Sequence, residues 1–426
     1  MTKTDGKPAP AGQPCRPLTE CRLCASKRII EVLTLTPTPP ANGLIAAKDL
    51  GTPVAHFPLR LIRCEACGHV QLGDIVNPAL LFSHYLYVSG TSGVMRAHLQ
   101  AQAEDIFRRH ALTSSAKPFV VEVGSNDGSL LKAFQARGAR VLGVDPARNI
   151  AEQAIAEGIP TIIDFFGAAV GRRLATEHGK ADVVVANHCF AHIEDIGSVV
   201  EGVKAVLASN GMFVFEVGYF LDVYEKKLFD TIYHEHLDYH HVTALKPFFE
   251  RHGMTLVDVE RHDIQGGAIR GFVRHGNQTP QPSVAAAIAA EKAAGLGERD
   301  TYRRFADGIA RLARDLKDLL GTLKAEGKSI AGYGMPAKAT TLMYHFGITR
   351  DVIDFIADAN PLKQGLFGAG LEIPIVAPSR LMSDKPDYVV ILAWNFADDI
   401  VAVNRDYLAA GGQFIVPLPE LVVRTD

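Results

Sequence analysis

Residues 118–128, PFVVEVGSNDG, decide the fold expected for this chain. A short run of β-branched residues ends at Val123, and Gly124 and Gly128 follow just before the helical stretch 130–138, LLKAFQARG. A glycine turn between a strand and a helix lets the backbone approach a ligand while the helix N-terminus faces it. The stretch therefore predicts the first unit of a nucleotide-binding type of α/β domain.

The same alternation of strands and helices continues along the chain. Valine-rich runs lie in ARVLGVDP (139–146), ADVVVANH (181–188) and GMFVFEVG (211–218), with helical stretches between them. Such alternation implies a parallel, doubly wound sheet. An amphipathic helix over about 94–112 leads into this domain, which we expect to span residues 82–282.

Further segments flank this domain. Residues 15–81 are short apolar runs broken by proline and glycine, which predicts a small irregular module. Residues 283–327 have a helical period interrupted by glycines and predict a two-helix connector. Strands and helices alternate again over 328–426, so we expect a second, smaller Rossmann-like α/β domain there. Residues 1–14 are polar and rich in proline and glycine, and we expect them to be disordered.

The bulk composition limits the possible partners. The 426 residues, 47% hydrophobic and 21% charged, suffice for two or three domains with large cores. A net charge of -3 lacks the basic excess with which nucleic-acid and anionic-membrane binders neutralise phosphates. The N-terminus has no signal-peptide core, and no apolar run approaches the roughly 20 residues that cross a bilayer. We therefore expect a cytoplasmic protein without nucleic-acid or membrane partners.

Four of the six cysteines form two CxxC pairs, Cys21/Cys24 and Cys64/Cys67. In a long chain without an export signal, such pairs indicate metal rather than disulfides. Four thiolates are the ligand set of a closed structural zinc site, which leaves no position for a reacting water. Unrelated free cysteines are the alternative. The residues interpreted as bystanders are Cys15, Cys189 and His69.

Acidic residues around the glycine turn indicate the cofactor. Asp145 closes the next strand, where a carboxylate can bind ribose hydroxyls, and Asp164 falls where such folds often meet adenine. Glu122 inside the first strand and the absence of a strict GxGxxG favour S-adenosylmethionine (SAM) over NAD. The expected cofactor-binding residues are Glu122, Gly124, Asn126, Asp127, Gly128, Asp145, Asp164 and Asn187.

Residues 233–241, YHEHLDYHH, form the densest cluster of titratable side chains. A solvated loop or a metal site would also explain the composition. The cluster follows the strand at 211–218, whose carboxyl end opens on the ligand crevice of an α/β sheet, which favours catalysis. His192 should reach the same crevice after its own strand. His236 could act as a general base near neutral pH.

A second glycine turn, GYGMPAK (332–338), opens the last domain. Its lysine could meet a diphosphate, although a simple tight turn is an equal alternative. Later loops on the same face carry further possible sugar or base contacts. The expected substrate-binding residues of this domain are Gly334, Lys338, Asn360, Lys363, Trp394 and Asn395.

This set of motifs, in this order, resembles the bacterial deoxysugar C-methyltransferases that act on nucleotide-linked 4-keto sugars. The matching stretches are CRLC, CEACGHVQL, YLYVSGTSGVMRAH, EVGSNDGSLL, NHCFAHI, FDTIYHEH, QGGAIR, GYGMPAKAT and VVILAWN. The resemblance implies an α/β chain with a zinc-binding N-terminal module and a central Rossmann-like SAM-dependent methyltransferase domain. It also implies a C-terminal Rossmann-like domain that helps to hold the nucleotide sugar.

The resemblance also implies residue roles. The histidine of the YxEH run, here His236, is the family's general base. Its expected companions around the keto sugar are Tyr233, Glu235 and His192, with Tyr85 or Tyr87 as a further substrate-facing tyrosine. Where relatives read a YHSSGSS-like string this chain reads YVSGTSG, and LDYHH follows its YxEH run. These departures leave the sugar and its nucleotide open, with dTDP favoured over GDP or CDP, in a monomer or small homo-oligomer.

The expected reaction starts at the carbon beside the ketone, whose proton a neutral His236 can remove. His192 and Tyr233 would stabilise the enolate, which then attacks the sulfonium methyl group. A zinc-containing SAM-dependent methyltransferase acting on RNA or another small carbonyl compound is the alternative, but an RNA enzyme should be basic. An NAD-dependent oxidoreductase would need the GxGxxG pattern that 332–338 lacks.

Overall fold

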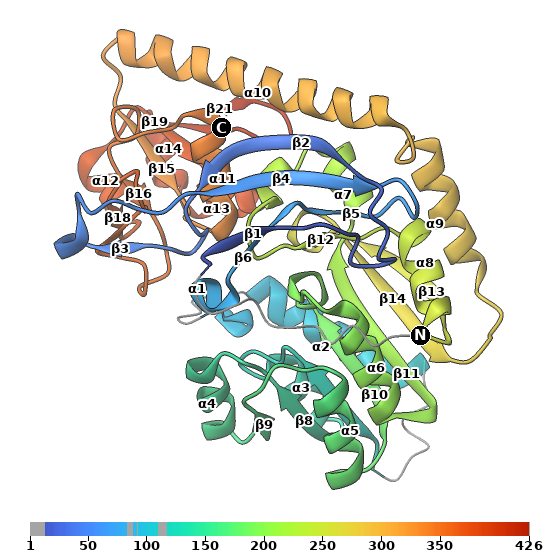
Figure 1. Cartoon of the computed structure of the whole chain (residues 1–426). Coiled ribbons are helices and arrows are strands. Elements are labelled where there is room, and N and C mark those ends of the chain that lie inside the picture. The colour runs from blue at the N-terminus through green and yellow to red at the C-terminus, as the bar shows by residue number, and fades with distance from the viewer. Residues whose placement is uncertain (1–12, 83–87, 92, 110–116, 426) are drawn as a thin grey trace.

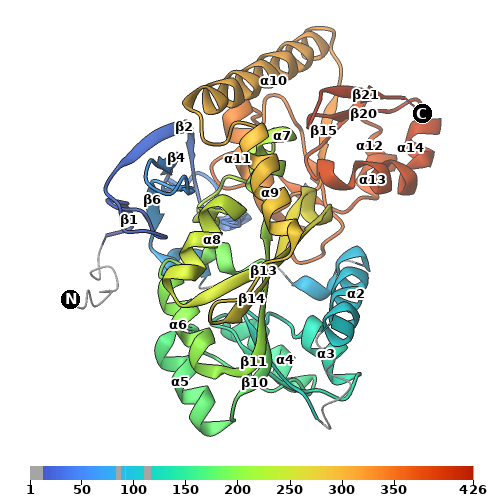
Figure 2. The same ribbon diagram turned by 90° about the vertical axis from the view of Figure 1, so that its right-hand side faces the viewer.

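The computed structural model describes residues 13–82, 88–91, 93–109 and 117–425. The three largest β-sheets of the described residues lie in the N-terminal module, in the middle of the chain and at the C-terminal end. Figures 1 and 2 show the module and the C-terminal domain above the central sheet, with a long helix running across the top. Among the described helices, none is long and apolar enough to cross a membrane.

The central sheet has seven strands in the order β13-β14-β11-β10-β7-β8-β9. The strands β11, β10, β7, β8 and β9 are parallel, whereas β13 and β14 join antiparallel at the β11 edge. The sequence predicted a parallel sheet, but two of its strands are antiparallel. A short turn at 263–267 folds β14 back along β13. The bounds are β7 Phe119–Val123, β8 Arg140–Val144, β9 Thr161–Ile162, β10 Ala181–Asn187, β11 Leu207–Gly218, β13 Met254–His262 and β14 Ala268–His275.

Helices cover both faces of this sheet. Along β7 and β10, alternate residues point to opposite sides, so Val120 and Val183 pack in one apolar cluster and Val121 and Val184 in the other. The first cluster is covered by α2, α3 and α4, and the second by α5, α6 and α8. The helix bounds are α2 Gly93–Arg109, α3 Ser129–Gln135, α4 Arg148–Ala156, α5 Ala168–Glu177, α6 Ile196–Val206 and α8 Val242–Arg251.

The N-terminal module is more regular than the sequence predicts. Its antiparallel sheet has the order β12-β5-β4-β2, and β1 pairs separately with β6. In β4, Phe57, Leu59 and Leu61 alternate with more exposed residues, which is the pattern of a half-buried strand. The prolines and glycines that suggested irregular structure lie mostly between the strands. The bounds are β1 Cys15–Pro17, β2 Ile29–Thr38, β4 Phe57–Cys64, β5 Val70–Leu72, β6 Asp74–Val76 and β12 Asp238–Tyr239.

The C-terminal domain has a six-stranded sheet in the order β18-β16-β15-β19-β20-β21, parallel except for β21. Helix α11 (Ala337–Phe346) follows the glycine turn after β15. Two helices precede this domain, α9 (Pro282–Ala293) and α10 (Arg299–Ala325). The strand bounds are β15 Ile330–Tyr333, β16 Ile356–Ala357, β18 Ile375–Val376, β19 Tyr388–Ile391, β20 Gln413–Val416 and β21 Val422–Arg424.

Strand pairing ties the N-terminal module to both other parts. Strand β12 belongs to the histidine-rich segment that follows the central β11, yet it pairs with β5 of the module. On the other side, β3 (Ile45–Ala46) pairs with β17 (Leu366–Phe367) of the C-terminal domain. The module therefore spans the junction between the other two domains.

Candidate active site and zinc site

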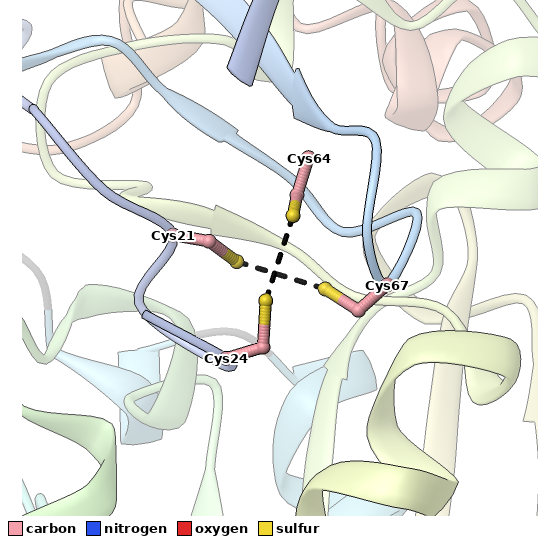
Figure 3. Close-up of side chains that lie close together, drawn as sticks. All are labelled: Cys21, Cys24, Cys64 and Cys67. Atoms are coloured by element: carbon pink, nitrogen blue, oxygen red, sulfur yellow. Dashed lines mark hydrogen bonds between the residues drawn. The ribbon is translucent and has the colours of Figure 1, made fainter. Parts of the chain in front are cut away.

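The four cysteines of the CxxC pairs converge at one point, as Figure 3 shows. The Sγ atoms of Cys21 and Cys67 lie 3.6 Å apart, and those of Cys24 and Cys64 lie 3.5 Å apart. A tetrahedral zinc ion with Zn–S bonds of about 2.3 Å separates its sulfur ligands by about 3.8 Å. The thiol arrangement therefore fits a closed structural zinc site without rearrangement of the fold.

A cavity of about 360 Å³ extends from the carboxyl ends of β7, β8 and β10 toward the N-terminal module. The loop after β7 has left-handed backbone at Gly124 and Asn126, and the backbone N–H of Asn126 donates to Asp145 Oδ2 over 2.8 Å. A Cβ atom on Gly124 would lie 2.6 Å from that of Cys189, so this close approach requires glycine. The loop is thus a compact ligand cradle.

Acidic side chains dominate the cofactor end of this cavity. Burial raises the pKa of Glu122 well above its usual value, and the charges of Asp127 and Asp145 raise it further. Its buried Oε2 has no hydrogen-bond partner among the described residues. This cluster suits a cationic ligand such as SAM, which carries a sulfonium and an ammonium group.

Most of the expected cofactor residues line the cavity. Those that do are Glu122, Gly124, Asn126, Asp127, Asp145 and Asn187. Gly128 lies just behind the loop, where it starts α3 with a left-handed backbone. Asp164 does not line the cavity, and its carboxylate forms an ion pair with Arg173 over 3.0 Å. The next residue, Phe165, lines the cavity instead. Phe165 is 64% exposed, so its ring is accessible to a ligand in the cavity.

The expected base, His236, is held from both ring nitrogens. Nδ1 lies 2.8 Å from the carbonyl oxygen of Thr231, to which it must donate, so Nε2 accepts from the Tyr233 hydroxyl over 2.7 Å. Burial lowers the pKa of His236 to about 4. The ring of His192, which lines the cavity, lies 4.9 Å from that of His236 between centroids, and burial also lowers its pKa well below the usual value. Both imidazoles are neutral near pH 7.

Glu235 also lines the cavity and comes from the same segment. Burial raises its pKa to about 7, although the amide of Asn42 donates to Oε1 over 2.9 Å. Asn42 belongs to the N-terminal module and was not expected at the site. No local sequence pattern connects the two residues, which are 193 positions apart.

The C-terminal domain holds the loop that carries Thr231. Trp394 Nε1 donates to Oδ2 of the buried Asp230 over 2.5 Å, and Lys338 Nζ lies 3.9 Å from the same oxygen and 3.5 Å from the Trp394 ring centroid. Thr341 Oγ1 donates to the Ile232 carbonyl over 2.9 Å. Lys338 and Trp394, expected to bind substrate, therefore lie against the loop that carries Thr231 and do not line the cavity at the ends of β7, β8 and β10.

The remaining expected substrate residues are dispersed. Gly334 makes a tight turn whose N–H bonds to the Ala357 carbonyl, and Lys363 Nζ donates to the carbonyl of Met335 over 2.7 Å. Asn360 accepts from the N–H of Leu362, while Asn395 lines a separate shallow hollow with Trp394. None of these lines the large cavity. Tyr85 and Tyr87 lie outside the described residues.

The histidine-rich segment also reaches the zinc module through Asp238 in β12. Its Oδ1 bonds to His69 Nε2 over 2.7 Å and lies 3.7 Å from Arg22 Nη1. His241 Nε2 bonds to the carbonyl of Gly68 over 3.1 Å. His69, interpreted from the sequence as a bystander to the zinc site, thus links the second cysteine pair to the histidine-rich segment.

Comparisons with known proteins agree with this arrangement. Family models match a zinc binding domain at residues 21–82, a methyltransferase domain at 95–259 and a C-methyltransferase C-terminal domain at 263–419. The C-methyltransferase NovU of Streptomyces niveus is 39% identical over 95% of this chain and 96% of its own length.

More distant matches are shorter. A ubiquinone biosynthesis O-methyltransferase of Chromobacterium violaceum is 30% identical over 26% of this chain and 48% of its own length. The crystal structure of magnesium protoporphyrin IX methyltransferase from Synechocystis PCC 6803 with bound SAM is 12% identical. It covers 43% of this chain and 82% of that chain, with a TM-score of 0.33.

The glycine cradle, the acidic cavity and the matching domain models define a SAM-dependent methyltransferase with a structural zinc site. More particularly, the chain belongs to the C-methyltransferase family that includes NovU.

Proposed function

We propose that this C-methyltransferase acts on a nucleotide-linked 4-keto deoxysugar and methylates the carbon next to the ketone. The observation that carries the proposal is the neutral His236, whose Nε2 lone pair faces the Tyr233 hydroxyl beside the cavity-lining His192. The sequence motifs that resemble deoxysugar C-methyltransferases supply the substrate class. dTDP is the favoured nucleotide.

The site supports an enolate mechanism. A ketone acidifies the proton on the neighbouring carbon, and His236 Nε2 is the final acceptor of that proton. His192 is a candidate donor to the charge that moves to the ketone oxygen, and Tyr233 is the other once Nε2 has taken up the proton and no longer accepts from the hydroxyl. When bound, SAM supplies the methyl group from its sulfonium, and the enolate carbon forms the new bond. Glu235 lines the same cavity as His192.

Each domain has its own role in the proposed reaction. Residues 82–282 bind SAM and carry the base, and residues 328–426, after a connector at 283–327, hold the nucleotide sugar. Residues 15–81 carry the structural zinc. Lys338 of the C-terminal domain lies 3.9 Å from Asp230, the residue before Thr231, and this contact supports communication between nucleotide binding and the base. A cytoplasmic monomer or small homo-oligomer belongs to the same proposal.

Mass spectrometry tests this proposal. Purified enzyme is incubated with methyl-labelled SAM and 4-keto-6-deoxy sugars linked to dTDP, GDP or CDP. We expect a labelled methyl group on one sugar, lost with His236→Ala and retained with His178→Ala, a half-exposed histidine outside the cavity. A panel in which no sugar gains the label while SAM still binds would contradict the substrate class.

A further inference from the structure

The charges along the cavity raise a problem for an anionic intermediate. Six acidic residues line it, and no lysine or arginine does so among the described residues. An enolate oxygen needs a positively charged or strongly donating group. The lining residues that could carry such a charge are the histidines His188, His192 and His234.

Two of these histidines are neutral. Burial lowers the pKa of His192 well below its usual value and that of His234 to about 4. Neither ring contacts a carboxylate of a described residue. His188 differs, because its Nε2 lies 3.1 Å from Oε1 of Glu216, a fully buried residue of β11. A carboxylate oxygen only accepts hydrogen bonds when it is ionised, so this contact fixes Nε2 of His188 as the donor.

The Glu216 carboxylate is itself fixed in the ionised state. Burial opposes its ionisation, but hydrogen bonds from His188 and His98 and the charge of Arg270 hold the pKa of Glu216 well below the usual value. Arg270 Nε donates to Oε2 over 2.9 Å, and His98 Nε2 lies 2.7 Å from Oε1. Glu260 is the other carboxylate near Arg270, at 3.8 Å. The carboxylate is therefore a permanent acceptor for the Nε2–H of His188.

The backbone also fixes His188 at the cavity wall. Its φ is +50°, a left-handed conformation that is uncommon for a residue with a side chain, and its N–H donates to the Glu216 carbonyl over 2.7 Å. Burial is the main cause of the lowered pKa of both His192 and His236, and the neighbouring His188 lowers both slightly further. The ring therefore lies within electrostatic reach of the proposed base.

We propose that His188, held by the Glu216 carboxylate at the cavity wall, is a further catalytic residue that stabilises the charge on the enolate oxygen. The inference rests on the proposed function. The proton on the carbon moves to His236, and its electron pair moves onto the ketone oxygen, where His188 binds the negative charge. The pair then returns to form the carbon–carbon bond as the S–CH3 bond breaks. Glu216 is a positioning residue for His188.

The test is His188→Asn, because asparagine tolerates the left-handed backbone but lacks the imidazole ring. Sugar is incubated in D2O with S-adenosylhomocysteine, and exchange of the proton beside the ketone is followed by NMR. We expect the exchange rate and kcat to fall about 100-fold or more, as for the loss of an oxyanion donor, with little change in sugar KM. Calorimetry should show unchanged binding of S-adenosylhomocysteine.

His98→Asn is the matched control, since His98 contacts the same carboxylate oxygen but does not line the cavity. We expect a much smaller loss from it. Equal losses in both variants, or an exchange rate in His188→Asn within twofold of the parent, would overturn the role of His188. Failure of the parent enzyme to exchange or methylate any sugar would instead refute the proposed function.

Discussion

The Tyr233 hydroxyl donates to Nε2 of His236 over 2.7 Å, while the other ring nitrogen bonds to a backbone carbonyl. This pairing fixes the tautomer of the imidazole and marks Nε2 as the only basic position on the ring. It also brings a phenol to the atom that we propose as the acceptor of the substrate proton. The dyad is the centre of the chemistry proposed for this enzyme.

Replacement of His236 should slow catalysis more than replacement of Tyr233. We expect His236→Ala to lower kcat by about 10²- to 10⁴-fold, the usual contribution of a general base. Tyr233→Phe should lower it by about 10- to 100-fold, because the imidazole remains. Tyr239→Phe is the control, since its hydroxyl contacts the same Thr231 carbonyl at 3.4 Å without touching Nε2. Steady-state kinetics that rank the three variants in another order would contradict this account.

The titration of Glu235 should contribute to the pH dependence of the free energy of unfolding. Its pKa near 7 exceeds the value of about 4.5 expected in the unfolded chain, so the folded state binds more protons between these values. The contribution of Glu235 to the free energy of unfolding should therefore fall as pH rises from about 4.5 to 7, by up to about 3 kcal/mol, and level off above. The buried histidines contribute with the opposite sign, so the Glu235 contribution is the difference between the parent and the Gln variant. Urea unfolding of the parent and of Glu235→Gln at pH 5 and pH 8 measures this. A Gln variant with the same pH dependence as the parent would exclude Glu235 as its source.

Zinc removal should reach the catalytic segment through β12. We expect Cys64→Ser to lose about one zinc ion per chain and to melt at a lower temperature. Amide exchange should rise at 237–241, because β5 and Asp238 bind this segment to the zinc module. Cys15→Ser, at a cysteine outside the cluster, should keep its zinc. Unchanged exchange in zinc-free protein would show that the module does not support the site.

Trp394 should act on catalysis at a distance. Trp394→Phe removes the Nε1–H that bonds to Asp230 and leaves a buried carboxylate oxygen without that donor. Such a loss costs about 1–3 kcal/mol of unfolding free energy. We expect a lower kcat with unchanged SAM affinity, because the carbonyl of the next residue, Thr231, orients His236. A variant that lost stability but kept its kcat would separate this contact from the base.

Local sequence patterns predicted the parts of the site that are built from residues close together in the chain. The glycine turn after Val123, the acid at Asp145 and the cysteine pairs all depend on short-range spacing, and the structure brings each group together. The domain boundaries and residue roles drawn from the sequence remain predictions.

Contacts between distant segments could not be predicted in this way. The bond from Asn42 to Glu235 and the pairing of β12 with β5 join residues from separate domains. Glu216 had a visible signal, a carboxylate inside the otherwise apolar strand GMFVFEVG. Its partners His98 and Arg270 lie far away in the sequence, so only the fold shows why that charge is buried.

The most direct test of the central claim is the position of the transferred methyl group. The product made from 13C-methyl SAM and the accepted keto sugar is analysed by NMR for long-range coupling from the methyl protons. The account predicts a methyl group on carbon, coupled to the neighbouring carbonyl carbon. A methyl group on oxygen or nitrogen would contradict it.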